Sequence, residues 1–390
     1  MYQYQCCQVS IYSMGDISIC GVFFMESCDI VNDFFEFVGA DEVLNLVKLN
    51  PKAFTRKSKM EFKNIICFML TRGSDNTTVE LDKYSNAVGI PLITRQAYSL
   101  SRQQINPMIF KHLNDWLVDK MYRYRDYKTW NDYLILAVDG CLLNLPWVDE
   151  LKEEYGGKTN KTNEIEAISA RSSGLYDCLN NIMVDFEIEP YKVSEKVLAI
   201  KNIENSIKTI KDKNPLIIFD RYYASLELFH YLLKLNLNFV FRLKKSYYKK
   251  ERSNMGSDDE FINIKVNNSR TNHIKDLDLK DELKKLEQFN LRVTRIILDS
   301  GEEEWLISNL PLEKFNTNDM KELYNLRWKI ETSYDALKNS LEIERITAKK
   351  KLTVEQDFYS KIINYNLSQE IIKDAEKDMD ENKKNTTKLT

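Results

Sequence analysis

The chain has 390 residues, of which 43% are hydrophobic and 29% charged, and its formal net charge is −3. This describes an ordinary globular protein that is long enough for two or three domains, and the overall charge does not indicate a nucleic-acid partner. Seven cysteines without a CxxC pair, and three histidines without ligand-like spacing, argue against a disulfide framework and a zinc site and for reduced thiols in a cytosol.

Residues 1–30 form an atypical N-terminal segment. Within it, residues 17–25 are apolar, but the run is short and Asp16 precedes it without any basic residue. A signal peptide or a membrane span is therefore not expected. Met25 is an alternative start of the native protein.

Residues 31–130 are expected to form a helical domain. Residues 51–130 hold 14 Lys and Arg against 7 Asp and Glu, whereas residues 1–50 hold 1 against 7. Such a basic block is compatible with phosphate binding, and it is equally common as an accident of surface composition.

A helix is expected to begin after Thr94, which can act as its N-cap. Arg95, Gln96 and Arg102 would then lie on an exposed polar face of this helix. A helix, a turn at Gly89 and a second helix are what a helix-turn-helix DNA reader needs, and a solvated surface helix is the alternative.

Residues 131–243 change to strands that alternate with helices. Two apolar runs are followed by a carboxylate, Asp139 in one case and Asp220 in the other. This pattern predicts an α/β sheet whose chemistry lies at the carboxyl ends of its strands. Taken singly, Asp139 is a common turn former before Gly140, and Asp220 is a possible helix cap.

Residues 244–312 are rich in Lys, Asn and Asp before they become apolar. They are expected to form a β-rich insertion with a hairpin at residues 299–301. The polar residues 373–390 form a tail that is expected to lack regular structure.

Residues 313–372 are expected to contain one long helix, capped at Thr317 or Asn318, and further helices after it. At 100° per residue, four of its polar side chains share an arc of about 60°. They are Tyr324, Arg327, Glu331 and Lys338. This stripe suits a DNA phosphate held beside a metal ligand, and the alternative is a solvated stripe with a Glu331–Arg327 ion pair.

Three carboxylates, Asp139, Asp220 and Glu331, meet the needs of phosphodiester cleavage by two hard divalent ions. In such a site one ion activates the attacking oxygen and the other stabilises the leaving oxygen. No histidine or cysteine nucleophile competes for this role.

With these residues the chain resembles DDE transposases of the insertion sequence 4 family. Asp139-Gly140, Asp220-Arg221 and the spacing of Tyr324, Arg327, Glu331 and Lys338 match the family's three blocks, and the last of these is its Y-R-E-K signature. The resemblance implies an α/β, RNase H-like catalytic core with a β-rich insertion, preceded by a helical domain that binds DNA ends.

The resemblance also implies roles for these residues. Asp139, Asp220 and Glu331 would be catalytic ligands of two Mg²⁺ ions, for which Mn²⁺ could substitute. Tyr324, Arg327 and Lys338 would grip phosphates, while Trp305 would stack on a flipped base, or else pack the insertion onto the core. Position 141 is Cys where the family has a small hydroxyl residue, and position 222 is Tyr where Gly is frequent.

The expected function is DNA transposition by cut-and-paste, in the bacterial cytosol or nucleoid. The partner would be double-stranded DNA, both the inverted-repeat ends and the target, bound by a dimer on synapsed ends, without a membrane or an organic cofactor. The alternatives are a DNA-binding derivative that has lost catalysis and an RNase H-like nuclease.

Overall fold

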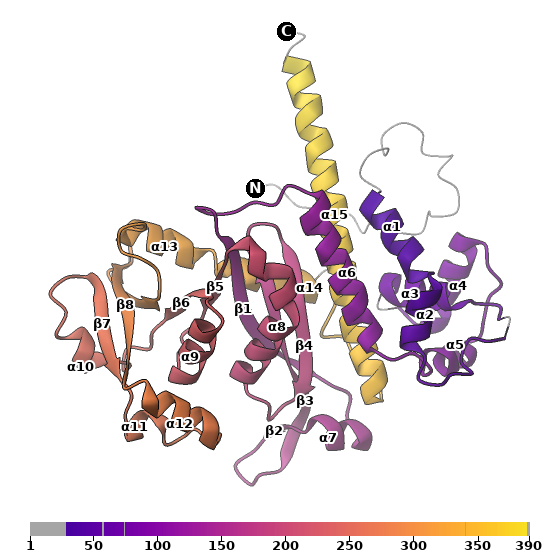
Figure 1. Ribbon diagram of the computed structural model, residues 1–390. Helices are drawn as coiled ribbons and strands as arrows, with labels where there is room; N and C mark the ends of the chain where they lie inside the picture. The colour runs from indigo at the N-terminus through magenta and orange to yellow at the C-terminus, as the bar shows by residue number, and fades with distance from the viewer. Residues whose placement is uncertain (1–28, 57, 74, 340, 388–390) are drawn as a thin grey trace.

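The computed structural model describes residues 29–56, 58–73, 75–339 and 341–387. The expectations for residues 1–28 therefore lie outside the described residues. Figure 1 shows a central sheet with the helices of the first third of the chain on one side and the strands of residues 259–308 on the other.

The first part of the chain is helical, as predicted. Thr94 caps α5, since its side chain accepts a hydrogen bond from the Ala97 N–H at 3.1 Å. The preceding helix, α4, ends at Gly89, whose φ of +68° is a left-handed conformation that favours glycine. The helices are α1 (Asp29–Val38), α2 (Asp41–Val47), α3 (Phe62–Thr71), α4 (Thr77–Val88), α5 (Arg95–Arg102) and α6 (Met108–Tyr124).

The described residues contain a nine-stranded mixed sheet, in the order β2-β3-β1-β5-β6-β9-β8-β7, with β4 paired to β3. Strands β1, β5 and β6 are parallel neighbours, and all other pairs are antiparallel. The strands are β1 (Leu134–Asn144), β2 (Gly157–Thr159), β3 (Ile165–Asp177), β4 (Ile182–Pro190), β5 (Pro215–Phe219), β6 (Asn238–Arg242), β7 (Asp259–Lys265), β8 (Gln288–Ile297) and β9 (Glu303–Ser308).

Residues 244–312 contribute three strands to this sheet rather than forming a separate one. Strand β9 pairs with β6, so the sheet continues from the parallel strands into β9, β8 and β7. The predicted hairpin between β8 and β9 is confirmed, with Gly301 in its turn at φ +80°. The helices of this stretch are short: α10 (Lys249–Arg252), α11 (Asn268–Thr271) and α12 (Leu277–Lys285).

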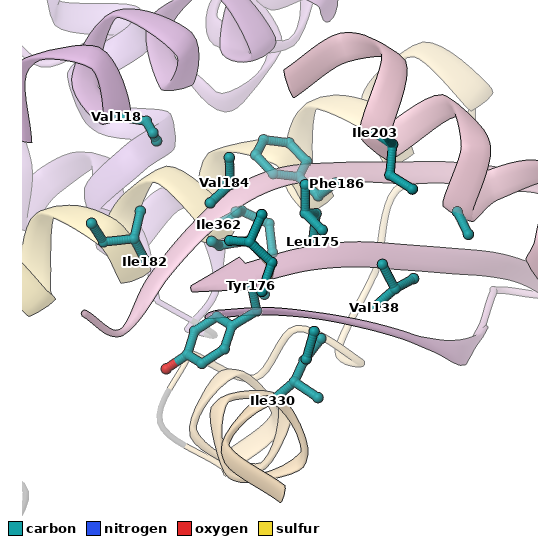
Figure 2. Close-up of a cluster of buried hydrophobic side chains, with 14 of the residues drawn as sticks. Val118, Val138, Leu175, Tyr176, Ile182, Val184, Phe186, Ile203, Ile330 and Ile362 are labelled. Carbon is teal, nitrogen blue, oxygen red and sulfur yellow. The ribbon is translucent and has the colours of Figure 1, made fainter. Parts of the chain in front are cut away.

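Helices cover the strands and bury apolar side chains against them. In Figure 2, Ile203 of α8 (Glu195–Ile210) and Ile330 of α14 (Trp328–Asn339) lie on opposite sides of the strands. Both side chains are fully buried. Removing such side chains from water is the main stabilising contribution to folds of this kind. The two remaining helices at the strands are α7 (Asp149–Tyr155) and α9 (Leu226–Lys234).

The free edge of β4 is closed by polar side chains from two helices. Lys111 Nζ of α6 donates to the Phe186 carbonyl at 2.9 Å, and Asn114 Nδ2 donates to the Val184 carbonyl at 3.0 Å. From α15 (Lys351–Thr387), Asn366 donates to the Met183 carbonyl and accepts from the Met183 N–H, both at 2.9 Å. These bonds satisfy backbone groups that an edge strand otherwise leaves unpaired.

Three expectations about the last part of the chain are wrong. The long helix is broken into α13 (Thr317–Asn325) and α14, and the N-cap of α13 is Asn316, which forms a capping box with Asp319. The helix α15 continues to Thr387, so most of the tail expected to lack regular structure is helical. Across the described residues, every helix is too short or too polar to span a membrane.

Candidate active site

Asp139 and Asp220 occupy neighbouring positions on two parallel strands. The last paired residues of β1 and β5 are Val138 and Phe219, and each carboxylate comes directly after one of them. The sequence had placed Asp139 at the end of its strand. It lies within β1 instead, because β1 continues to Asn144 in antiparallel pairing with β3. The structure thus brings the two acids together at the carboxyl edge of the parallel strands.

The charges around Asp139 are those of a cluster of acids. The pKa of Asp139 is raised to about 6, chiefly by burial and in smaller part by the negative charges of Glu331 and Asp220. The Gly140 N–H and the Arg327 guanidinium act in the opposite direction. Since charges influence a pKa strongly only at short range, the three predicted acids belong to one electrostatic site.

Helix α14 brings Glu331 to this site by packing on β1. Tyr334, one turn after Glu331, donates its hydroxyl to the Asp139 carbonyl at 3.1 Å. The approach requires a glycine on β3, because a Cβ at Gly174 would lie 3.0 Å from Tyr334 Oη and 2.7 Å from Met183 Sδ. The register of β3 places Gly174 opposite Asp139, so a small residue is needed where the helix contacts the sheet.

The Glu331 carboxylate is bound by an arginine of the same helical region. Arg327 Nη2 donates to Glu331 Oε1 at 2.7 Å. Arg327 is only 4% exposed and lies at the break between α13 and α14. The ion pair considered from the sequence is therefore present, but it is largely buried rather than part of a solvated stripe.

Several polar atoms around the acids are buried without a hydrogen-bond partner among the described residues. They include Arg327 Nε, Tyr324 Oη and Tyr223 Oη. Buried polar groups are rarely left unsatisfied, and exceptions of this kind often indicate a missing ligand, ion or water. Tyr324 is also only 2% exposed, so it does not share one open stripe with Lys338 as the sequence had suggested.

The oxygen donors of the three acids suit a hard divalent cation, but the three carboxylates are not close enough together to coordinate one ion. In the described parts of the chain, no three Asp, Glu, His or Cys residues are grouped closely enough to hold a metal ion. Asp139, Asp220 and Glu331 offer only oxygen donors, which suits Mg²⁺ or Mn²⁺. Because Arg327 holds the Glu331 carboxylate, the Glu331 side chain must turn before all three acids can bind the same metal ion.

Sequence reasoning missed a fourth acid, Glu304. It is buried on β9, pairs with Arg242 at 2.8 Å, and has a pKa that burial raises and that the nearby charge of Asp220 raises further. Because side chains alternate along a strand, Trp305 points to the opposite face of β9 from Glu304. The alternation of exposed Glu303, buried Glu304 and the apolar residues that follow gives no clear signal in the sequence, so Glu304 could be found only once β9 was placed beside β6.

The predicted base-stacking residue, Trp305, is half-buried beneath a cation. The Arg252 guanidinium lies 4.5 Å from its ring centroid, and its indole N–H donates to Glu303 Oε2 at 3.3 Å. Lys338, the last residue of the signature, pairs with Glu344 at 3.2 Å. Neither side chain contacts the three acids in the arrangement described here.

The expectation of one exposed face on α5 holds only in part. Arg95 and Gln96 are exposed in the first turn, as predicted. Arg102 is buried, with 6% exposed, and donates to Asp357 Oδ1 of α15 at 2.7 Å. Its place on an exposed face was therefore predicted wrongly, because the partner that buries it lies 255 positions away.

Comparison with known proteins returns transposases. A profile described as the transposase DDE domain matches residues 130–367. The transposase InsG for insertion sequence element IS4 of Escherichia coli (strain K12) is 22% identical over 295 residues, which cover 73% of this chain. The chain spans 63% of the length of that relative. A solved piggyBac transposase synaptic complex with hairpin DNA aligns with a TM-score of 0.44 and 11% identity, over 88% of this chain and 75% of that one.

Proposed function

The chain belongs to the transposase DDE domain family, and we propose that it cuts the ends of a mobile DNA element and joins the freed 3′-hydroxyls to target DNA. One observation carries this proposal. Asp139 and Asp220 directly follow the last paired residues of two parallel strands, and Glu331 stands on a helix packed against the first of them. Two adjacent strand ends and one covering helix can supply three carboxylates to a single phosphodiester.

The catalytic core in this proposal is RNase H-like. It is built from the antiparallel strands β4, β3 and β1 followed by the parallel strands β5 and β6. Its two parts are residues 131–243 and 313–372, and residues 244–312 are the insertion that extends the sheet. Residues 31–130 form the domain that binds DNA ends, with Arg95 and Gln96 exposed for contact.

Asp139, Asp220 and Glu331 would hold two Mg²⁺ ions, with Mn²⁺ able to substitute. Bound divalent ions of this kind lower the pKa of an attacking water or hydroxyl and stabilise the leaving oxygen. The protein fixes Asp139 through the strand that carries it, whereas Glu331 becomes available when it leaves Arg327. A phosphate of the DNA backbone is a suitable competitor for that guanidinium, because arginine binds phosphate in the same bidentate manner as carboxylate.

The signature residues then have separate tasks. Arg327 Nε and Tyr324 Oη are buried donors without a partner among the described residues, so a phosphate oxygen would satisfy them. Lys338 is partly exposed and can exchange Glu344 for a phosphate with little loss of stability, since such surface ion pairs contribute only about 0–1 kcal/mol. Arg102 has a structural task instead, because it fastens α5 to α15.

The partner is double-stranded DNA, first the inverted-repeat ends and then the target, and a dimer holds the synapsed ends. The test uses a duplex that carries the terminal repeats found in the DNA flanking this reading frame. Asp139→Asn, Asp220→Asn and Glu331→Gln should each bind this duplex with about the wild-type affinity and fail to cut it in Mg²⁺ or Mn²⁺.

The matched control is Asp335→Asn, because Asp335 is an exposed carboxylate on the same helix as Glu331. This variant should cut normally. Cleavage by all three acid variants would refute the assignment. Wild-type binding without cutting in any divalent metal would instead identify a DNA-binding derivative, and cutting without strand transfer would identify a plain nuclease.

A further inference from the structure

Four large apolar side chains are exposed around one short backbone bridge in the helical region. Lys48 and Ile105 form an antiparallel bridge, so the chain that leaves α2 runs beside the chain that leaves α5. Figure 1 shows these two helices next to each other, away from the sheet. The exposed side chains, called here the bridge patch, are Leu46 (64%), Leu49 (50%), Leu100 (59%) and Met108 (47%).

Hydrogen bonds across the bridge hold the members of this patch close together. The Leu49 N–H donates to the Gln104 carbonyl at 3.1 Å, and Leu100 lies one helical turn before Gln104. On the other side of the bridge, the Asn106 N–H donates to the Val47 carbonyl at 2.8 Å, and the two other members of the patch lie within two residues of this bond. Single exposed leucines are common on protein surfaces, whereas a contiguous apolar patch indicates a contact surface.

Charges of opposite sign flank the two ends of the bridge patch. Because the bridged segments are antiparallel and each follows its own helix, α2 and α5 extend from the bridge in opposite directions. Asp41 and Glu42 begin α2 and lie at one end. Lys52 follows the bridge and lies at the other end, on the side of α5. All three charged side chains are exposed, and none of them forms an ion pair within the parts of the chain that the structure describes.

We propose that the bridge patch binds the same patch of a second copy of this chain. A two-fold axis that lies in the interface next to the bridge brings the acidic end of one copy over the basic end of the other, so both ends are paired at once. A two-fold interface requires this kind of self-complementarity. A partner of a single charge sign, such as DNA, would match one end of the patch and be repelled by the other.

The size of the bridge patch fits a weak and reversible dimer. Its four apolar side chains are a small centre compared with the roughly 20–30 residues that each partner contributes to a standard stable interface. The inference concerns the chain without DNA and goes beyond the proposed function, in which DNA ends are held by the dimer. It does not depend on that function, because none of the three acids takes part in the contact.

The test is sedimentation velocity of the full chain without DNA or divalent metal, over about a hundred-fold range of protein concentration. The wild type should change from monomer toward dimer as the concentration rises. Leu100→Glu places an unpaired charge in the apolar centre of both copies and should raise the dimer Kd at least about ten-fold. The matched control is Leu277→Glu, because Leu277 is 72% exposed but lies on α12, and this variant should dimerise as the wild type does.

Charge reversal distinguishes the two-fold contact from non-specific association. Glu42→Lys and Lys52→Glu should each weaken the dimer, because like charges then face each other across the axis. The variant with both substitutions restores opposite charges at both ends and should regain most of the wild-type affinity, which a merely damaged fold would not do. Recovery in the double variant, with dissociation in Leu100→Glu alone of the two leucine variants, supports the inference. A wild type that stays monomeric throughout, an equal loss in Leu277→Glu, or no recovery in the double variant overturns it and leaves the cleavage assay above untouched.

Discussion

Replacing Arg327 by glutamine should make the DNA-free protein bind Mn²⁺ more tightly. The substitution removes the donor that holds the Glu331 carboxylate at 2.7 Å. Glu331 is then free to turn toward Asp139 and Asp220, which stay where the strands hold them. The prediction is opposite to that for an arginine whose only task is to support the fold.

The size of the effect follows from the bond that is lost. A hydrogen bond between charged groups contributes about 1.5–3 kcal/mol, and the lower part of this range applies because the glutamate side chain is 37% exposed. If metal binding must first break this bond, its removal should tighten Mn²⁺ binding about 10- to 40-fold. Loss of one positive charge near the acids acts in the same direction.

The assay is the electron paramagnetic resonance signal of free Mn²⁺ during titration of the protein, with no DNA present. A double-mutant cycle separates the two causes. Arg327→Gln should gain little affinity when Glu331→Gln is already present, because no carboxylate remains to be released. An equal gain in both backgrounds would show that charge alone is responsible. Unchanged or weaker Mn²⁺ binding in Arg327→Gln would refute the reasoning.

Three predictions concern stability. Burial raises the pKa of Asp177 from 3.8 to about 6, so the folded chain keeps a proton that the unfolded chain has lost between about pH 4 and 6. Asp177 should therefore lower the free energy of unfolding by up to about 3 kcal/mol as the pH rises through this window. The pKa values of Asp139 and Asp185 are raised to about 6 as well, so Asp177→Asn should reduce the slope in urea titrations by this amount rather than abolish it. Gly174→Ala should lower the free energy of unfolding by about 1–3 kcal/mol in thermal unfolding, because the added Cβ would be too close to Met183 and Tyr334. Gly256→Ala is the control and should be near neutral, since its Cβ would lie 3.8 Å from the nearest atom. Arg102→Met should cost about 1.5–3 kcal/mol in urea unfolding, because Asp357 loses its partner at 2.7 Å and keeps only Arg72 at 3.8 Å. The exposed Arg95→Met should change stability by about 0.5 kcal/mol or less, and similar losses in the two variants would contradict the assigned contact.

Local patterns in the sequence were sufficient to predict the strands and most helices. The apolar runs before Asp139 and Asp220 could be recognised as strands because their hydrophobic residues are contiguous and β-branched. The neighbouring positions of the two acids then followed from parallel pairing. The turn at Gly301 could also be predicted, since a glycine between two apolar runs indicates a hairpin, and its φ of +80° explains the need for glycine.

Features that depend on contacts far along the chain could not be predicted in this way. No glycine or proline marks the break between α13 and α14, at which Tyr324 and Arg327 are buried. The burial of Arg102 depends on Asp357, and the role of Glu304 depends on the joining of β9 to β6. Helical periodicity describes one element at a time, so it contains no information about these partners.

The closure of β4 by α6 and α15 makes the family-matched region dependent on chain outside it. Residues 130–367 contain Asn366 but lack α6, and with it Lys111 and Asn114. A fragment that begins at residue 130 would leave the Val184 and Phe186 carbonyls of β4 without these hydrogen bonds. It would also remove Lys111, whose Nζ lies 3.1 Å from the buried Asp185 carboxylate. Truncation of the N-terminal helices should therefore yield an aggregating protein, because α6 belongs to the same folding unit as the sheet.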